Sequence, residues 1–192
     1  MFHLDNIYYF IDNFNSKEIL KLNKNIKIIY RNYSNKNEEK LINKIKIFCK
    51  INKRKFYIAN NLEMALKLNL DGVYIPSFNK SLKVKYFKKK NFEILGSAHN
   101  FKEIKTKEKQ GVDIIFIAPI FQVKKKNYFL KIIKFNLISK LTNKKLVALG
   151  GINKSNIKKI KLLNCYGLAS ISYVNETLRK WVVILKITYK KS

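Results

Sequence analysis

The sequence predicts an α/β protein of the (β/α)8 (TIM) barrel class with lean loops. Short apolar runs of strand type alternate with amphipathic, lysine-rich stretches along the chain. Three segments, 69–75, 110–117 and 164–171, repeat one pattern: a helix that ends near Asn or Gly, a connector and a strand. Eight such βα units in series imply a parallel sheet that closes into a barrel. An open doubly wound sheet would want a glycine-rich loop after the first strand, where residues 11–14 contain no glycine.

The expected strands are continuous apolar runs, as is typical of buried parallel strands. They cover residues 7–11, 26–30, 55–58, 72–75, 92–95 and 113–118, and the last two lie within 146–153 and 167–172. Helices are expected from Ser16, through 41–48 after a cap at Ser34 or Asn35, over 62–66, from Asn153 or Ser155, and over 176–189, which carries Trp181. No linker divides the chain, so residues 1–192 are expected to form a single domain.

The composition is that of a globular protein with a strongly basic surface. Hydrophobic residues make up 47% of the chain, which argues against disorder. The formal net charge is +29, but only Arg31, Arg54 and Arg179 among the 41 basic residues are arginines. Base readout favours arginine, and the lysines are spread over nearly every expected helix. We therefore interpret the charge as compositional drift and predict no specific nucleic-acid partner, with a polyanion binder as an alternative.

The chain is expected to work in the cytoplasm, away from membranes. Its N-terminus lacks the basic region of a signal peptide, and the apolar run 181–185 is too short to span a bilayer. Cys49 and Cys165 lack metal-type spacing, which favours two thiols in a reducing compartment. The sequence makes no prediction of oligomeric state.

Polar residues gather at the carboxyl ends of the expected strands, where barrel enzymes place their active sites. They are Asp12, Arg31, Asn60, Asn79, Ser97, Lys124, Lys125, Lys126, Gly151 and Ser172. Asp71 and Asp113 precede their strands and are expected at the opposite, structural end. With Asp12 as the single carboxylate at a carboxyl end, a strong magnesium site is not expected, and no cluster suggests zinc. His99, alone after its strand, is expected to have a structural role.

The glycine pair Gly150-Gly151 favours a phosphate site. Glycines after a strand let backbone N–H groups approach a ligand, and a helix beginning near Asn153 or Ser155 would direct its dipole there. The neighbouring expected strand likewise ends at a small polar residue, where Ser172 follows Ile171. Two such strand ends form the phosphate site found after strands seven and eight of many barrels. The alternative is a tight turn without a ligand.

Taken together, these strand ends resemble the thiamine phosphate synthase and TenI family of (β/α)8 barrels. The segments that carry the resemblance are 71–75, 96–99, 118–121, 148–152 and 169–172. Synthases of this family join hydroxymethylpyrimidine diphosphate to thiazole phosphate and expel pyrophosphate with magnesium. The resemblance implies that Gly151, Ile171 and Ser172, with Gly150 beside them, hold the thiazole phosphate. It also implies that Arg31 and Ser97 act at the diphosphate and pyrimidine side, and that Lys126 matches the lysine that ends the family's loop after the sixth strand. These three residues are the predicted catalytic residues.

The chain departs from the family at the positions that hold the metal and the pyrimidine. The two magnesium-binding aspartates fall on Asn60 and Asn79, the pyrimidine-binding glutamine falls on Ile29, and two loop threonines fall on Val123 and Lys125. Lys124, Lys125 and Lys126 are an alternative means of stabilising departing pyrophosphate. The catalytic histidine of the TenI branch falls on Pro119. The sequence thus predicts a thiamine phosphate synthase-like transferase, with a TenI-like or non-catalytic phosphate-ligand binder as the alternative.

Overall fold

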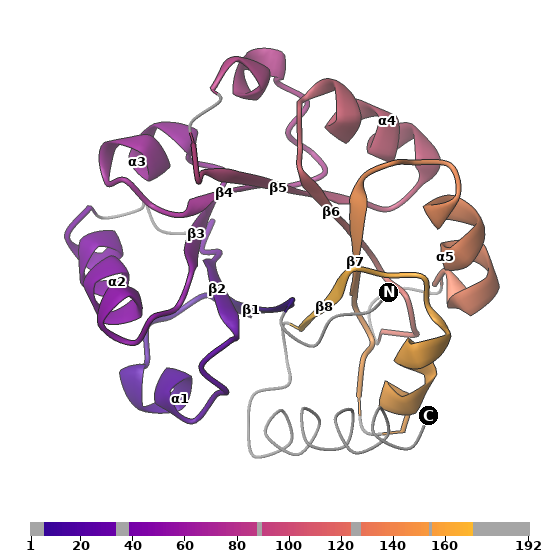
Figure 1. The fold of residues 1–192 in the computed structure, drawn as a ribbon, viewed down its shortest axis with the longest axis horizontal. Coiled ribbons are helices and arrows are strands. Elements are labelled where there is room, and N and C mark those ends of the chain that lie inside the picture. The colour runs from indigo at the N-terminus through magenta and orange to yellow at the C-terminus, as the bar shows by residue number, and fades with distance from the viewer. Residues whose placement is uncertain (1–5, 34–38, 88–89, 124–127, 154, 171–192) are drawn as a thin grey trace.

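The chain forms a closed barrel of parallel strands. The computed structural model describes residues 6–33, 39–87, 90–123, 128–153 and 155–170. Within these ranges the strands follow one another around the barrel in sequence order, and the last pairs with the first (Figure 1). They are β1 (Ile7–Ile11), β2 (Lys27–Tyr30), β3 (Phe56–Ala59), β4 (Gly72–Ile75), β5 (Glu93–Ala98), β6 (Ile114–Ile117), β7 (Lys145–Leu149) and β8 (Gly167–Ser170). The predicted (β/α)8 barrel is confirmed.

Helices surround the barrel on its outside (Figure 1). They are α1 (Ser16–Leu20), α2 (Glu39–Ile51), α3 (Leu62–Lys67), α4 (Phe101–Lys109) and α5 (Lys131–Ser139), with the 3-10 helices η1 (Leu82–Tyr86) and η2 (Ile157–Leu162). The side chains of Asn15, Asn61 and Asn100 accept backbone N–H groups of α1, α3 and α4, so several asparagines of this Asn-rich chain act as N-caps. In the described part of the chain, none of the helices has the length and apolar character needed to cross a membrane.

The first six strands lie within one residue of their expected bounds, apart from β5. That strand extends to Ala98 because Ser97 and Ala98 pair with Phe116 and Ile117 of β6, so Ser97 lies inside a strand instead of after it. The helix expected near Asn153 or Ser155 is present as the 3-10 helix η2, which begins slightly later, at Ile157, because a turn precedes it. The expected cap at 34–35 and the helix over 176–189 lie outside the described residues.

Aromatic rings fill the inside of the barrel. Phe116 lies 4.9 Å from the Tyr8 ring, 6.0 Å from Phe10 and 5.5 Å from Tyr74, in edge-to-face arrangements measured between ring centroids. These residues belong to a buried cluster that also contains Tyr57. Because the interior is packed, a substrate has to bind above the rings, at the mouth of the barrel.

The polar groups at the amino ends of the strands are bonded to one another. Lys27 Nζ donates to Asn6 Oδ1 at 3.0 Å and to the Tyr8 hydroxyl at 3.3 Å, while the Tyr57 hydroxyl donates to Glu93. The two aspartates expected at this end behave similarly, because each carboxylate accepts a backbone N–H of the strand before it. These contacts confirm the structural role predicted for Asp71 and Asp113.

Candidate active site at the carboxyl ends of the strands

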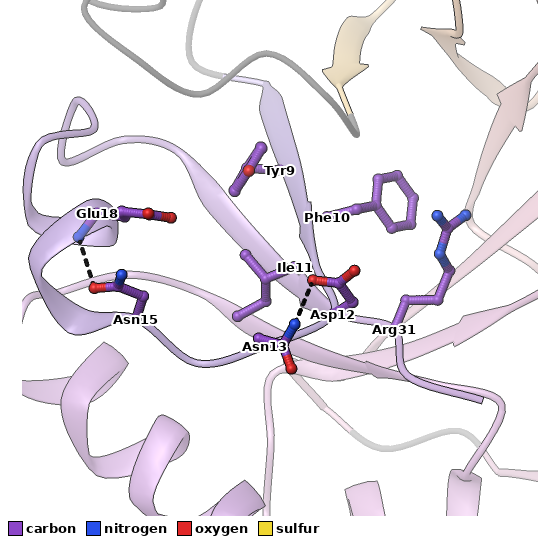
Figure 2. Close-up of a pocket in the computed structure, with 8 residues that line it drawn as sticks. All are labelled: Tyr9, Phe10, Ile11, Asp12, Asn13, Asn15, Glu18 and Arg31. Atoms are coloured by element: carbon purple, nitrogen blue, oxygen red, sulfur yellow. Dashed lines mark hydrogen bonds between the residues drawn. The ribbon is translucent and has the colours of Figure 1, made fainter. Parts of the chain in front are cut away.

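Arg31 and Asp12 lie at the mouth of the barrel, beyond adjacent strands. The backbone N–H of Arg31 donates to Ile11 O at 2.7 Å, and its guanidinium lies 5.0 Å from the Phe10 ring centroid. Figure 2 shows Arg31 beside that ring, with the Asp12 carboxylate nearby. A pocket of about 290 Å³ opens here, lined by Tyr9, Phe10, Ile11, Asp12, Asn13, Asn15, Glu18 and Arg31. The guanidinium thus lies over the Phe10 ring beside this pocket, where it can bind an anion.

Ser97 lies in the same mouth, on the inside of the barrel. It is 6% exposed and hydrogen-bonds the hydroxyl of Tyr74 on the neighbouring strand β4. Burial raises the pKa of the Tyr74 phenol to about 12, while the Ser97 bond and the charge of Arg31 act to lower this pKa. Arg31 and Ser97, predicted as catalytic residues on separate strands, are therefore joined through two packed rings: Arg31 lies over Phe10, Ser97 bonds Tyr74, and the ring centroids are 5.1 Å apart. Tyr74 was missed as a site residue because it reads as one more aromatic residue of an apolar strand.

Asn60 and Asn79 meet at the ends of β3 and β4, as adjacent parallel strands require. Asn79 Nδ2 donates to Asn60 Oδ1 at 2.7 Å, and Asn79 Oδ1 accepts the Ser81 N–H at 2.9 Å. Asn60 has a φ of 58°, a left-handed conformation that asparagine tolerates better than most residues. A pocket of about 420 Å³ adjoins the pair, with largely apolar walls from α3 and η1.

This amide pair does not fit a magnesium ion. Both side-chain oxygens already accept hydrogen bonds, and neither carries a charge to offset the dehydration of the metal. Within the residues that the structure describes, no group of three His, Cys, Asp or Glu side chains could hold a metal.

The glycine pair after β7 is fixed by contacts within the protein. Gly150 and Gly151 have φ values of 91° and 72°, which favour glycine. A Cβ on Gly151 would clash with the carbonyl oxygens of Phe121 and Gln122 in the loop after β6, the second at 2.6 Å. The loop is joined to this turn by a hydrogen bond from Phe121 N to Gly150 O at 3.2 Å. These contacts account for both glycines, so phosphate binding there stays a prediction.

His99 has the structural surroundings expected of it. Its Nδ1 lies 3.0 Å from Glu103 Oε2, and its backbone N–H donates to the same oxygen at 2.8 Å. Asn100 caps the helix that carries Glu103. The histidine is therefore tied to the first turn of α4.

The remaining predicted site residues cannot be placed. Lys124, Lys125, Lys126, Ile171 and Ser172 lie outside the described residues. The loop of lysines after β6 and the second half of the predicted phosphate site therefore remain sequence predictions.

Comparison with known proteins finds a matching family. The model of the family described as thiamine monophosphate synthase matches residues 17–174. A thiamine-phosphate synthase of Prochlorococcus marinus is 34% identical over 132 residues, which cover 66% of this chain and 37% of that protein. A thiamine-phosphate synthase of Methanococcus maripaludis is 30% identical over 122 residues, covering 62% and 58%. The chain therefore spans only about a third to three fifths of these two relatives.

The fold comparison agrees. The chain superposes on a thiamine phosphate pyrophosphorylase from Pyrococcus furiosus with a TM-score of 0.75 and 19% sequence identity. The match covers 93% of this chain and 96% of the other. At this identity the match shows a shared fold.

Proposed function

The chain belongs to the thiamine monophosphate synthase family, and on this premise we propose that it is a transferase of thiamine biosynthesis. It would join hydroxymethylpyrimidine diphosphate to thiazole phosphate: a bond forms between the thiazole nitrogen and the pyrimidine methylene carbon, the carbon–oxygen bond to the diphosphate breaks, and pyrophosphate leaves. The observation that carries the proposal is the arrangement at the mouth of the barrel: Arg31 lies over the Phe10 ring, Phe10 packs 5.1 Å from the Tyr74 ring, and Ser97 hydrogen-bonds the Tyr74 hydroxyl.

Arg31 is suited to the diphosphate. A guanidinium offers paired N–H donors to phosphate oxygens, and its charge offsets the negative charge that grows on the departing pyrophosphate. Ser97 would orient the Tyr74 hydroxyl, and its own hydroxyl would be a second hydrogen-bond donor beside it. Lys126, with Lys124 and Lys125, would add positive charge from the loop after β6. Asn60 and Asn79 would bind the diphosphate through amide N–H groups, and we propose no step that requires magnesium.

The thiazole phosphate would bind across the ends of β7 and β8, at Gly150, Gly151, Ile171 and Ser172. The substrates are small molecules, and nothing in the proposal requires a nucleic acid or a membrane. A cytoplasmic site of action is supported by Cys49 and Cys165, which are both buried free thiols.

A second function is favoured by the Asn60–Asn79 pair. Amides in place of carboxylates, together with Pro119 at the position of the TenI histidine, suit a protein that binds the phosphorylated ligand without turnover. Such a binder would show ligand-induced thermal stabilisation and form no product.

Growth of a synthase-deficient cell on medium without thiamine tests the transferase. The native chain should restore growth, and Arg31→Met should abolish it, because losing one charge-assisted contact to the transferring group costs about 10²–10³ in rate. Ser97→Ala should lower kcat/KM about tenfold, the value of one hydrogen bond. Lys17→Met, an exposed charge change on α1, serves as the control. Full growth with Arg31→Met would contradict the assignment of this residue.

A further inference from the structure

Lys107 is a buried cation that extends from α4 to the site. Its side chain has 0% exposure. Its stem crosses the outer face of β5 at Gly96, where a Cβ would come within 3.0 Å of Lys107 Cδ. Nζ then donates to Pro76 O at 2.8 Å, to Asn79 O at 2.9 Å and to Gln110 Oε1 at 2.8 Å. The absence of a side chain at Gly96 is what lets the ammonium reach the loop after β4.

The charge of Lys107 is not neutralised by an ion pair. All three acceptors are neutral carbonyl oxygens, and within the described residues Lys107 forms no ion pair with a carboxylate. Glu103, one turn earlier, binds His99 instead, and its charge only partly opposes the effect of burial on the Lys107 pKa. Burial lowers the pKa of the Lys107 ammonium to about 8, so the charged form is held at a cost to the folded state. An apolar side chain would pack between α4 and β5 without that cost, so packing alone does not account for a lysine.

The loop held by this ammonium carries a predicted substrate-binding residue. Gln110 Nε2 donates to Asn79 O at 3.0 Å and to Ser81 O at 2.9 Å, next to the bonds from Lys107. The Asn79 backbone is thereby clamped, and its side chain is left to donate to Asn60. The geometry of the amide pair therefore depends on Lys107 and Gln110.

We propose that Lys107 is a positioning residue that holds Asn79 against Asn60 and places a fixed positive charge behind this pair for a diphosphate-bearing substrate. The proposal rests on the transferase function above. The pair lies where the family resemblance implies a magnesium ion, and its neutral oxygens do not fit that ion. A buried ammonium supplies positive charge at the same strand ends without needing carboxylates to hold it. In a low-dielectric surrounding its field reaches the mouth with little screening.

Titration calorimetry with inorganic pyrophosphate in EDTA tests the proposal. Lys107→Met removes both the charge and the clamp. Lys107→Gln removes the charge but keeps an amide that can donate to the same loop. Lys109→Met makes the same change of net charge on the exposed side of α4 and is the matched control. Circular dichroism establishes which variants fold, and Lys107→Gln decides the outcome if Lys107→Met does not fold.

We expect both Lys107 variants to bind pyrophosphate about tenfold more weakly than the native chain, and Lys109→Met to bind within about twofold of it. In turnover, Lys107→Gln should raise KM for the pyrimidine diphosphate and leave KM for thiazole phosphate unchanged, a split that a general loss of folding would not produce. Native affinity for pyrophosphate in a folded Lys107 variant would overturn this inference but not the proposed function. No pyrophosphate binding by the native chain would instead refute the diphosphate site on which the proposed function depends.

Discussion

Replacing both Asn60 and Asn79 with aspartate should convert the amide pair into a magnesium site. The two amides are joined by a hydrogen bond of 2.7 Å, so two carboxylates there would face each other at close range. Two unit charges 4 Å apart repel by about 4 kcal/mol at an effective dielectric constant of about 20. Part of this is relieved by loop movement or by retention of a proton, so we expect the double variant to lose about 1–3 kcal/mol of unfolding free energy without metal.

Magnesium should reverse this loss. At a free concentration one hundred times Kd, an ion that binds only the folded chain stabilises it by about 2.7 kcal/mol. Thermal unfolding with and without magnesium measures the effect, and calorimetry with pyrophosphate measures whether anion binding becomes metal-dependent. In EDTA the two new charges should repel pyrophosphate, so affinity should fall below that of the native chain. A magnesium response as strong in the native chain as in the variant would refute the reasoning, and Asp12 would then be the first metal ligand to test.

Three further substitutions test contacts that hold the barrel together. Burial acts to raise the pKa of Glu93, but hydrogen bonds from Tyr57 and Lys55 outweigh it and lower that pKa. The stability that these bonds provide is therefore present above the ordinary pKa of 4.5 and is lost as the pH falls. Glu93→Gln should flatten this acid dependence in urea unfolding, and an unchanged pH profile would contradict the prediction. Arg54→Met should cost about 2–4 kcal/mol in denaturant unfolding, because the guanidinium donates to four backbone carbonyls of the α1–β2 turn; native stability would refute this. Gly151→Ala should lower unfolding free energy by about 2–4 kcal/mol, since its Cβ would clash with the loop after β6 at a positive φ; a native melting temperature would show that the loop yields freely.

The barrel could be predicted because each strand is a continuous apolar run that is followed by polar or turn-forming residues. The end of β5 was misplaced because Gly96 and Ser97 read as a break in the sequence, whereas pairing with β6 continues the strand through them. The helix expected after β7 begins later than predicted for a similar local reason. Asn153 Oδ1 accepts the backbone N–H groups of Ser155 and Asn156, which forms a turn and delays the helix to Ile157.

The parts of the site that could be predicted are those set by strand order. Asn60 and Asn79 follow adjacent strands, and parallel pairing brings them together. Tyr74 and Lys107 could not be found in this way. The importance of Tyr74 depends on which face of β4 it occupies, and that of Lys107 on a side chain crossing from α4 to another loop over Gly96. Neither is visible in residue spacing.

Product formation by the purified chain tests the central claim most directly. Hydroxymethylpyrimidine diphosphate and thiazole phosphate are incubated with the protein in EDTA and in magnesium, and thiamine phosphate and pyrophosphate are both quantified. We predict that the two products appear in equal amounts and that magnesium changes the rate little, because we propose that Arg31, the lysines and the amide pair bind the diphosphate without a metal ion. The absence of product under both conditions, in a chain that thiazole phosphate stabilises against heat, would contradict the transferase and leave a phosphate-ligand binder.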